Sequence, residues 1–193
     1  MKMVINLYFD TEFTGLHKDT TLISIGITSS RGDAFYAELT DFGETQANPW
    51  IKENVLANTV RGGNHKLREM LDKDQNVLFV IGDKSDIREA LKQWLEHFES
   101  GIQFVSDVSH YDFVLLVDLL ADSALELPGY ISASCHDINQ DIARVLRVTD
   151  QEAFNFSREE LLTKLGKELP EGVKHNALYD AEVIKTIYSQ LQG

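Results

Sequence analysis

The sequence has little of several residue types, and each shortage excludes a class of protein. Its single cysteine, Cys135, excludes an internal disulfide and fits a reducing compartment, so we expect a cytoplasmic protein. Apolar runs stay below the roughly 18–20 residues of a membrane span, and the opening MKMVINLYFD lacks the pattern of a secretory signal, so no membrane partner is expected. With 3 prolines and 43% hydrophobic residues, the composition is that of a globular protein.

Basic residues are also scarce. The chain has 18 Lys and Arg against 31 Asp and Glu, which gives a net charge of −13. Proteins that wrap duplex DNA without sequence preference are normally basic, so the charge disfavours that class. An enzyme that holds a short single strand remains compatible with it, because few phosphates need contacts and bound cations invert the local field.

The hydrophobic pattern predicts a mixed-sheet α/β fold. Strands are predicted over Val4–Asp10, Thr21–Ser29, Asp33–Leu39 and Ile102–Asp107, with a brief apolar stretch at Val77–Ile81. Helices are predicted over Asn48–Asn58, Lys66–Asp72, the segment from the N-cap Ser85 to Gly101, Tyr111–Leu120, Asp137–Leu146, Glu159–Leu165 and Asn176–Leu191. Short links between the first three strands imply antiparallel neighbours. The length fits a single domain, 1–193, with an insertion at about 41–83.

Two acids lie at the end of the first predicted strand, in the segment YFDTEFTGL. Because side chains on a strand alternate between faces, Asp10 and Glu12 project from the same face. Two carboxylates beside an apolar strand repel each other and lose hydration unless a cation lies between them. The pair is therefore a candidate site for Mg²⁺ or Mn²⁺, which prefer oxygen ligands, although acids at strand ends are more often solvated.

A second polar group, SDVSHYD, lies between a predicted strand and an apolar helix. Asp112 falls at the start of that helix, where an acid also stabilises the helix dipole. Asp107, at the end of the strand, is an alternative candidate for the same functional role. His110 is an alternative candidate for a general base.

The third group is HNALYDA, at the start of the last predicted helix. Five residues on a helix turn about 140° past a full turn, so His175 and Asp180 cannot share a face if both are helical. We expect Asp180 on the helix and His175 on the loop before it, free to approach a substrate. His175 is a candidate general base near neutral pH, with helix capping or packing as the alternative.

In order, the three groups read D-x-E, then Y-D, then H-x4-D, and in this pattern the chain resembles the DEDDh exonuclease superfamily. FDTEFTGL, SHYDFVLL and HNALYDA resemble its three motifs, and because the acid of the second motif follows an aromatic residue, Asp112 matches better than Asp107. The DTEF opening and a tryptophan-containing segment at 48–50 resemble a small bacterial and phage exoribonuclease branch. The resemblance covers residues 4–191, although little beyond that tryptophan carries it within 41–83.

The resemblance implies an RNase H-like fold, with three antiparallel strands, then parallel strands, and helices flanking the sheet. It also implies a 3′→5′ exonuclease that hydrolyses phosphodiester bonds with two Mg²⁺ or Mn²⁺ ions. Asp10, Glu12, Asp112 and Asp180 would hold the ions, and His175 would take a proton from the attacking water. A homodimer is expected by analogy with the relatives.

The same resemblance implies where the substrate lies. Phe13, Thr14, Gly15 and Leu16 follow the metal pair, and in similar enzymes this stretch receives the terminal nucleotide. Apolar side chains there stack on a base without recognising its identity, and the alternative interpretation of Phe13 is a core residue. The expected partner is the 3′ end of a single strand. The branch slightly favours RNA over DNA, while no motif reports the contact to the 2′-hydroxyl that separates the two.

A basic cluster and the two tryptophans are the remaining residues that need an interpretation. The basic cluster Arg61, Lys66 and Arg68 is either a phosphate contact or a solvated face, and the solvated face is favoured. Trp50 and Trp94 are expected to pack inward.

Two other function classes stay open. One is a nucleic-acid or nucleotide binding module that has kept the fold and lost turnover; the presence of all five motif residues argues against it. The other is an RNase H-like endonuclease, but such enzymes generally lack the loop histidine. A purely structural protein is disfavoured, because a scaffold has no need of four converging acids.

Overall fold

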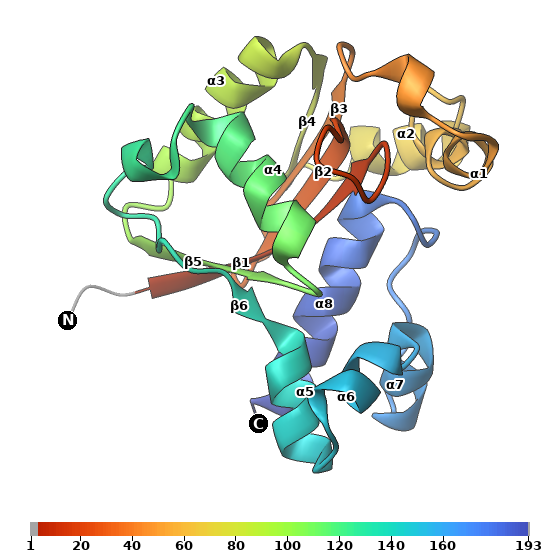
Figure 1. The fold of residues 1–193 in the computed structure, drawn as a ribbon, viewed down its shortest axis with the longest axis vertical. Helices are drawn as coiled ribbons and strands as arrows, with labels where there is room; N and C mark the ends of the chain where they lie inside the picture. The colour runs from red at the N-terminus through yellow and green to blue at the C-terminus, as the bar shows by residue number, and fades with distance from the viewer. Residues whose placement is uncertain (1–3, 193) are drawn as a thin grey trace.

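The computed structural model describes residues 4–192, which form a six-stranded mixed sheet with helices on both faces (Figure 1). The strand order is β4-β3-β2-β1-β5-β6. The strands are β1 Val4–Phe13, β2 Leu22–Ser29, β3 Ala34–Leu39, β4 Val77–Gly82, β5 Gly101–Ser106 and β6 His136–Asp137. The pairs β1–β2 and β2–β3 are antiparallel, and the pairs β1–β5, β5–β6 and β3–β4 are parallel. The predicted fold class is confirmed.

Helices cover both faces of the sheet. They are α1 Pro49–Asn54, α2 His65–Lys73, α3 Lys84–Glu96, α4 His110–Leu120, α5 Ile138–Leu146, α6 Asp150–Asn155, α7 Arg158–Lys164 and α8 Ala177–Leu191, with short 3₁₀ turns η1 Glu44–Gln46, η2 Leu56–Asn58 and η3 Ala124–Glu126. The helices α3 and α4 pack on one face, whereas α8 lies across β1 and β2 on the other. Figure 1 shows α5, α6 and α7 gathered below the sheet, at the end away from β4.

Burial on both faces explains the composition of the central strands. Every residue of β2 and β3 is buried, because α3 and α4 cover one side and α8 the other. Strands buried on two faces are rich in apolar residues rather than strictly alternating. The predicted last helix is confirmed as α8, in which Ala177, Ala181 and Ile187 are fully buried as the hydrophobic pattern predicts.

Two predictions of element boundaries are wrong, and one helix was missed. The first strand does not end at Asp10: β1 continues to Phe13 because it keeps pairing with β2. The N-cap of α3 is Asp83 rather than Ser85, since the Asp83 carboxylate accepts hydrogen bonds from two backbone N–H groups of the first turn. The helix α6 was not predicted; Thr149 and Glu152 form a capping box at its start.

The segment 41–83 adds α1, α2 and the strand β4 to the β3 edge of the sheet. Asn48 caps α1 by accepting a hydrogen bond from the Ile51 N–H, and Pro49 occupies the first helical position as predicted. The hydrophobic side chain of Ile51 is buried with Val55 against β2. Every helix within residues 4–192 is too short or too polar to cross a lipid bilayer.

Candidate active site

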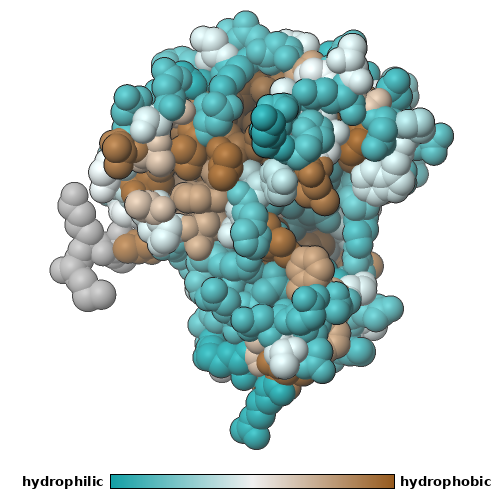
Figure 2. Space-filling view, in the orientation of Figure 1, coloured by the Kyte–Doolittle hydropathy of each residue, from teal (hydrophilic) through white to brown (hydrophobic). Residues whose placement is uncertain are grey.

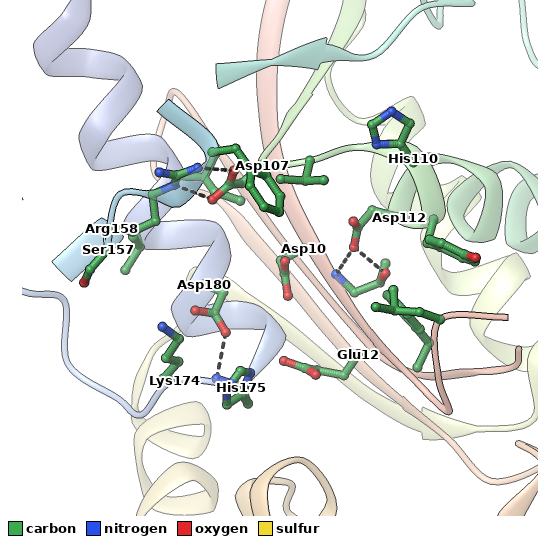
Figure 3. Close-up of a pocket in the computed structure, with 18 of the residues that line it drawn as sticks. Asp10, Glu12, Asp107, His110, Asp112, Ser157, Arg158, Lys174, His175 and Asp180 are labelled. Carbon is green, nitrogen blue, oxygen red and sulfur yellow. Dashed lines mark hydrogen bonds and ion pairs between the residues drawn. The ribbon is translucent and has the colours of Figure 1, made fainter. Parts of the chain in front are cut away.

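The three acidic motifs meet in a cleft of about 620 Å³. The end of β1, the start of α4 and the start of α8 all reach it (Figure 3). Its motif residues are Asp10, Glu12, Asp112, His175 and Asp180. Residues that are far apart in the sequence are therefore brought together as the motif order predicts.

The strand β1 presents its two acids on one face. Asp10 and Glu12 line the cleft, and Figure 3 shows the two carboxylates close to Asp180. Thr11 lies between them in the sequence and is buried, with 4% of its surface exposed. Its side chain points towards α4 and not into the space between the two acids.

Thr11 anchors the acid of the second motif. Its backbone N–H and its hydroxyl both donate to Asp112 Oδ1, at 3.0 and 2.6 Å. The Asp112 side chain is buried in the first turn of α4, and its other oxygen makes no hydrogen bond among the described residues. These two bonds fix the orientation of one carboxylate oxygen and leave the second for another partner.

The third motif has the geometry expected from its spacing. Asp180 lies in the first turn of α8, and the His175 backbone N–H donates to its Oδ2 at 2.9 Å. His175 lies in the preceding loop with φ +62°, in the left-handed region. Asn176 caps the helix by accepting from the Tyr179 N–H. The loop therefore holds the imidazole at the mouth of the cleft beside the acids.

The acids hold protons more tightly than exposed carboxyl groups do. Burial raises the pKa of Asp10 and of Glu12 well above the ordinary values, and the neighbouring carboxylates raise both further. Burial also raises the pKa of Asp112 to about 6 and that of Asp180 to about 7, although hydrogen bonds lower both. Clustered carboxylates of this kind repel one another unless a cation neutralises them.

The donor set fits a divalent cation. One ligand atom from each of Glu12, His175 and Asp180 lies within 4.8 Å of the other two. Among residues 4–192, no ion pair involves Asp10, Glu12, Asp112 or Asp180. Oxygen donors without a basic partner are the ligands that Mg²⁺ and Mn²⁺ prefer. His175 belongs to this triple, so it is close enough to serve either as a ligand or as a base.

Burial lowers the pKa of His175, and the charge of Lys174 lowers it further, whereas Glu159 raises it. A lowered pKa keeps the imidazole neutral at pH 7, which is the form that accepts a proton.

The predicted substrate loop is only partly at the cleft. Phe13, Gly15 and Leu16 line it; Leu16 is 78% exposed, and the Phe13 ring stacks on Tyr111 at 5.6 Å. Thr14 does not line it, because its hydroxyl is buried and donates to the Gln46 side chain at 2.6 Å. Thr14 fixes the base of the loop instead of facing a substrate.

Asp107 and His110, the alternatives to Asp112 and His175, lie in environments that differ from those of the motif residues. Asp107 lines the cleft but forms a paired contact with Arg158, at 2.5 and 2.8 Å, so its charge is compensated. His110 is exposed at the rim, and Figure 3 shows its ring apart from Asp10, Glu12 and Asp180.

The predicted basic cluster lies outside the cleft. The Arg61 guanidinium donates to the Leu39 carbonyl and lies over the Phe42 ring. Arg68 pairs with Asp72, and Lys66 lines a different groove. All three residues are exposed, in agreement with the favoured interpretation of this cluster as a solvated face.

The tryptophans differ. Trp94 packs against Phe35 and Phe98 as predicted. The prediction that Trp50 packs inward is wrong. The side chain is 51% exposed and lines the cleft, and its ring meets the His175 ring edge-on with 5.0 Å between the centroids. The cap at Asn48 turns the first residues of α1 towards the loop of His175, and Ile51 takes the inward position.

Several cleft residues were missed from the sequence, among them three from one region of the chain. Phe154, Arg158 and Lys174 line the cleft, and all three come from the α6–α7 region or the loop that follows it. The Thr149–Glu152 capping pattern is a signal in the sequence for the start of α6, whereas the exposure of Phe154 is known only from the structure.

Comparisons with known proteins agree with this geometry. A family model described as the 3′-5′ exoribonuclease Rv2179c-like domain matches residues 5–192. A structure of 3′-end specific recognition of histone mRNA stem-loop by 3′-exonuclease is similar with a TM-score of 0.62 at 15% identity, over 97% of this chain and 63% of that chain. A chain in a structure of the yeast NOT1 MIF4G domain co-crystallized with CAF1 is similar with a TM-score of 0.53 at 12% identity, over 98% of this chain and 78% of that chain.

At these identities the structural likenesses show the fold. This chain spans less than two thirds of the 3′-exonuclease chain that it resembles. No curated protein matches the chain.

Proposed function

The chain belongs to the Rv2179c-like 3′-5′ exoribonuclease domain family, and on that premise we propose that it removes nucleotides from the 3′ end of single-stranded nucleic acid, RNA in preference to DNA. Family membership confirms the predicted exonuclease superfamily and the predicted enzyme class. The observation that carries the proposal is the meeting of four motif acids and a loop histidine in one cleft, with one ligand atom from each of Glu12, His175 and Asp180 within 4.8 Å of the others.

We propose that Asp10, Glu12, Asp112 and Asp180 hold two divalent metal ions, Mg²⁺ or Mn²⁺. Bound ions of this kind lower the pKa of a water molecule and stabilise the charge that develops on the phosphate. The raised pKa values of the four carboxyl groups support the assignment, because a cation relieves the repulsion that makes these groups retain protons. The two bonds from Thr11 keep the Asp112 carboxylate oriented, as outer partners of metal ligands do.

His175 is the proposed general base. Its lowered pKa leaves an imidazole nitrogen free to accept the proton of the attacking water at neutral pH. The backbone bond from His175 to Asp180 ties the base to a metal ligand, so the two move as one unit. Leu16 and Phe13, on the loop after Glu12, are the proposed contacts to the terminal nucleotide.

The whole described chain is proposed to act as one exonuclease domain, with 41–83 as an addition at the β3 edge. The addition supports the site directly: the Asn58 side chain donates to the Lys174 carbonyl at 3.0 Å, next to His175. A homodimer and a cytoplasmic location stay predictions.

A gel time course on 5′-labelled RNA and DNA strands of one sequence, single-stranded and paired, tests the proposal. We expect a ladder that shortens from the 3′ end with Mg²⁺, fastest on single-stranded RNA and absent in EDTA. The Asp10→Asn variant is the matched control and should leave the strand intact. Internal fragments would indicate an endonuclease, and unchanged strands at all metal concentrations would indicate a binding module.

A further inference from the structure

We infer that Phe154 and Lys174 form a second nucleotide subsite in the cleft, for the residue on the 5′ side of the bond that is cut. Phe154 would stack on its base, and Lys174 would contact its phosphate. The inference rests on the proposed function, because it concerns the same strand in the same cleft. It would make the enzyme prefer a strand of two or more nucleotides over a single nucleotide ester.

Phe154 is presented to the cleft by a short, well-anchored helix. Its neighbour Ala153 is fully buried, whereas Phe154, about 100° further round the helix, has 51% of its surface exposed. The capping box at Thr149 fixes the start of α6. A single exposed apolar side chain needs no explanation, but this one lines the cleft that holds the acids. Figure 2 shows apolar surface where the upper body meets the lower part built by α5, α6 and α7.

Arg158 binds the backbone before and after Phe154 in the sequence. Its Nη1 donates to the carbonyls of Ala153 and Phe156, each at 2.9 Å. Its Nε and Nη2 donate to Asp107, and Nη2 also donates to Asn139 at 2.6 Å. A guanidinium has five N–H donors, and these contacts use all of them. Arg158 is therefore a rigid support for the position of Phe154 and has no donor left for a phosphate.

Lys174 is the cation that remains available. Of the described residues that line the cleft, it is the only lysine. Its ammonium pairs with Glu159 at 3.4 Å, and its side chain is 57% exposed. An exposed pair of this kind contributes little, so a phosphate can replace the carboxylate. The backbone is held in place because the Lys174 carbonyl accepts from Asn58.

The chain's charge makes such a contact useful. With a net charge of −13, the molecule repels a nucleic-acid strand except where a local cation offsets the field. Base stacking on an aromatic ring adds affinity without reading the sequence, as a general exonuclease requires. Together the two side chains provide the two contacts that single-strand grooves combine, a cation for the backbone and a platform for a base.

The test compares a tetranucleotide with a nucleoside 5′-(4-nitrophenyl) phosphate, which has no nucleotide on the 5′ side. The readout is the ratio of kcat/KM for the tetranucleotide to kcat/KM for the ester. Phe154→Ala and Phe154→Leu should lower this ratio about tenfold, because the loss of stacking on one base weakens binding by about that factor. Phe154→Trp keeps an aromatic ring and should keep the ratio within about twofold. Lys174→Met should lower it at low salt and flatten its salt dependence.

Leu125→Ala is the matched control, since Leu125 is 96% exposed and does not line the cleft. An unchanged ratio in Phe154→Ala, or a ratio in Phe154→Trp as low as in Phe154→Ala, would overturn the subsite. Anisotropy titrations of the labelled tetranucleotide in Ca²⁺ keep the test independent of turnover. About tenfold weaker binding by Phe154→Ala supports the subsite even if the wild type hydrolyses neither substrate, a result that would contradict only the proposed function; equal affinities contradict the subsite.

Discussion

The backbone of Ala177 lies directly against Gly26: a Cβ atom at residue 26 would be 2.3 Å from the Ala177 carbonyl carbon. Gly26 is the partner of Asp10 in the β1–β2 register, and Ala177 is the first residue of α8, which carries Asp180. The missing side chain therefore lets the start of α8 approach the strand that carries the first acid. This contact sets the separation between the first and third motifs.

Gly26→Ala should separate the two motifs. Because backbone atoms would block the new methyl group, α8 has to shift, and we expect a loss of about 3 kcal/mol of unfolding free energy, at the upper end of overpacking effects. We also expect Mn²⁺ affinity to fall with it. Gly129→Ala is the control, because a Cβ there meets nothing within 4 Å and should change the melting temperature little. Thermal melts and Mn²⁺ titrations of both variants check this; equal behaviour would refute the role of the contact.

Stability without metal should decrease as pH rises. The folded-state pKa values of about 6 for Asp112 and about 7 for Asp180 lie above the unfolded values near 4. A raised folded pKa gives stability that is present below the unfolded value and is lost as pH rises through the folded one. In EDTA, Asp180→Asn should therefore melt several degrees above the wild type at pH 8 and close to it at pH 4. Saturating Mg²⁺ should remove the advantage at pH 8. A variant less stable than the wild type at pH 8 would contradict the account.

Thr11→Val should weaken the metal site without removing a ligand. The substitution keeps the volume and the backbone bond to Asp112 but removes the hydroxyl bond of 2.6 Å. Since that hydroxyl lowers the pKa of Asp112, the pKa should rise in the variant. Loss of an outer partner typically lowers metal affinity about 10–100-fold. Mn²⁺ titration at pH 7 measures this, and Thr21→Val, away from the acids, is the comparison; unchanged affinity in Thr11→Val would refute the anchoring role.

His175→Ala should separate the two roles that the geometry allows. As a general base, His175 contributes about 10²–10⁴-fold to the rate, and its loss leaves Mn²⁺ affinity intact. As a metal ligand within the Glu12–His175–Asp180 triple, its loss would lower that affinity as well. We predict the first result, with loss of the acid limb of the pH–rate profile. Near-wild-type rates would exclude the base, and His110→Ala, at the cleft rim, should keep its activity.

Sequence patterns predicted the parts of the site that depend on local geometry. Alternation along a strand placed Asp10 and Glu12 on one face, and the helical repeat separated His175 from Asp180, as the structure has them. Local periodicity contains no information about which distant group a side chain will meet. It therefore missed the Arg158–Asp107 contact across 51 positions and the exposure of Trp50 beside His175.

The same limit applies to the fold. The positions along the chain of β1, β2, β3, β5 and the last helix follow from hydrophobic periodicity, which tertiary packing reinforces, whereas the parallel pairing was implied by the family resemblance. The six residues of α6 are too few to show a helical period, and its stability depends on a cap and on burial of Ala153. The resemblance placed Thr14 with its neighbours at the substrate, whereas its hydrogen-bond partner Gln46 lies 32 residues away and could not be foreseen from the local sequence.

The most direct test of the central claim is the identity of the first product. A single-stranded RNA with a unique nucleoside at its 3′ end is incubated with the wild-type protein and Mg²⁺, and the products are separated by chromatography. We predict that the 5′-monophosphate of the terminal nucleoside appears first and that the strand shortens by one residue at a time. Release of internal oligonucleotides, or of a nucleoside 3′-phosphate, before that monophosphate would contradict the account.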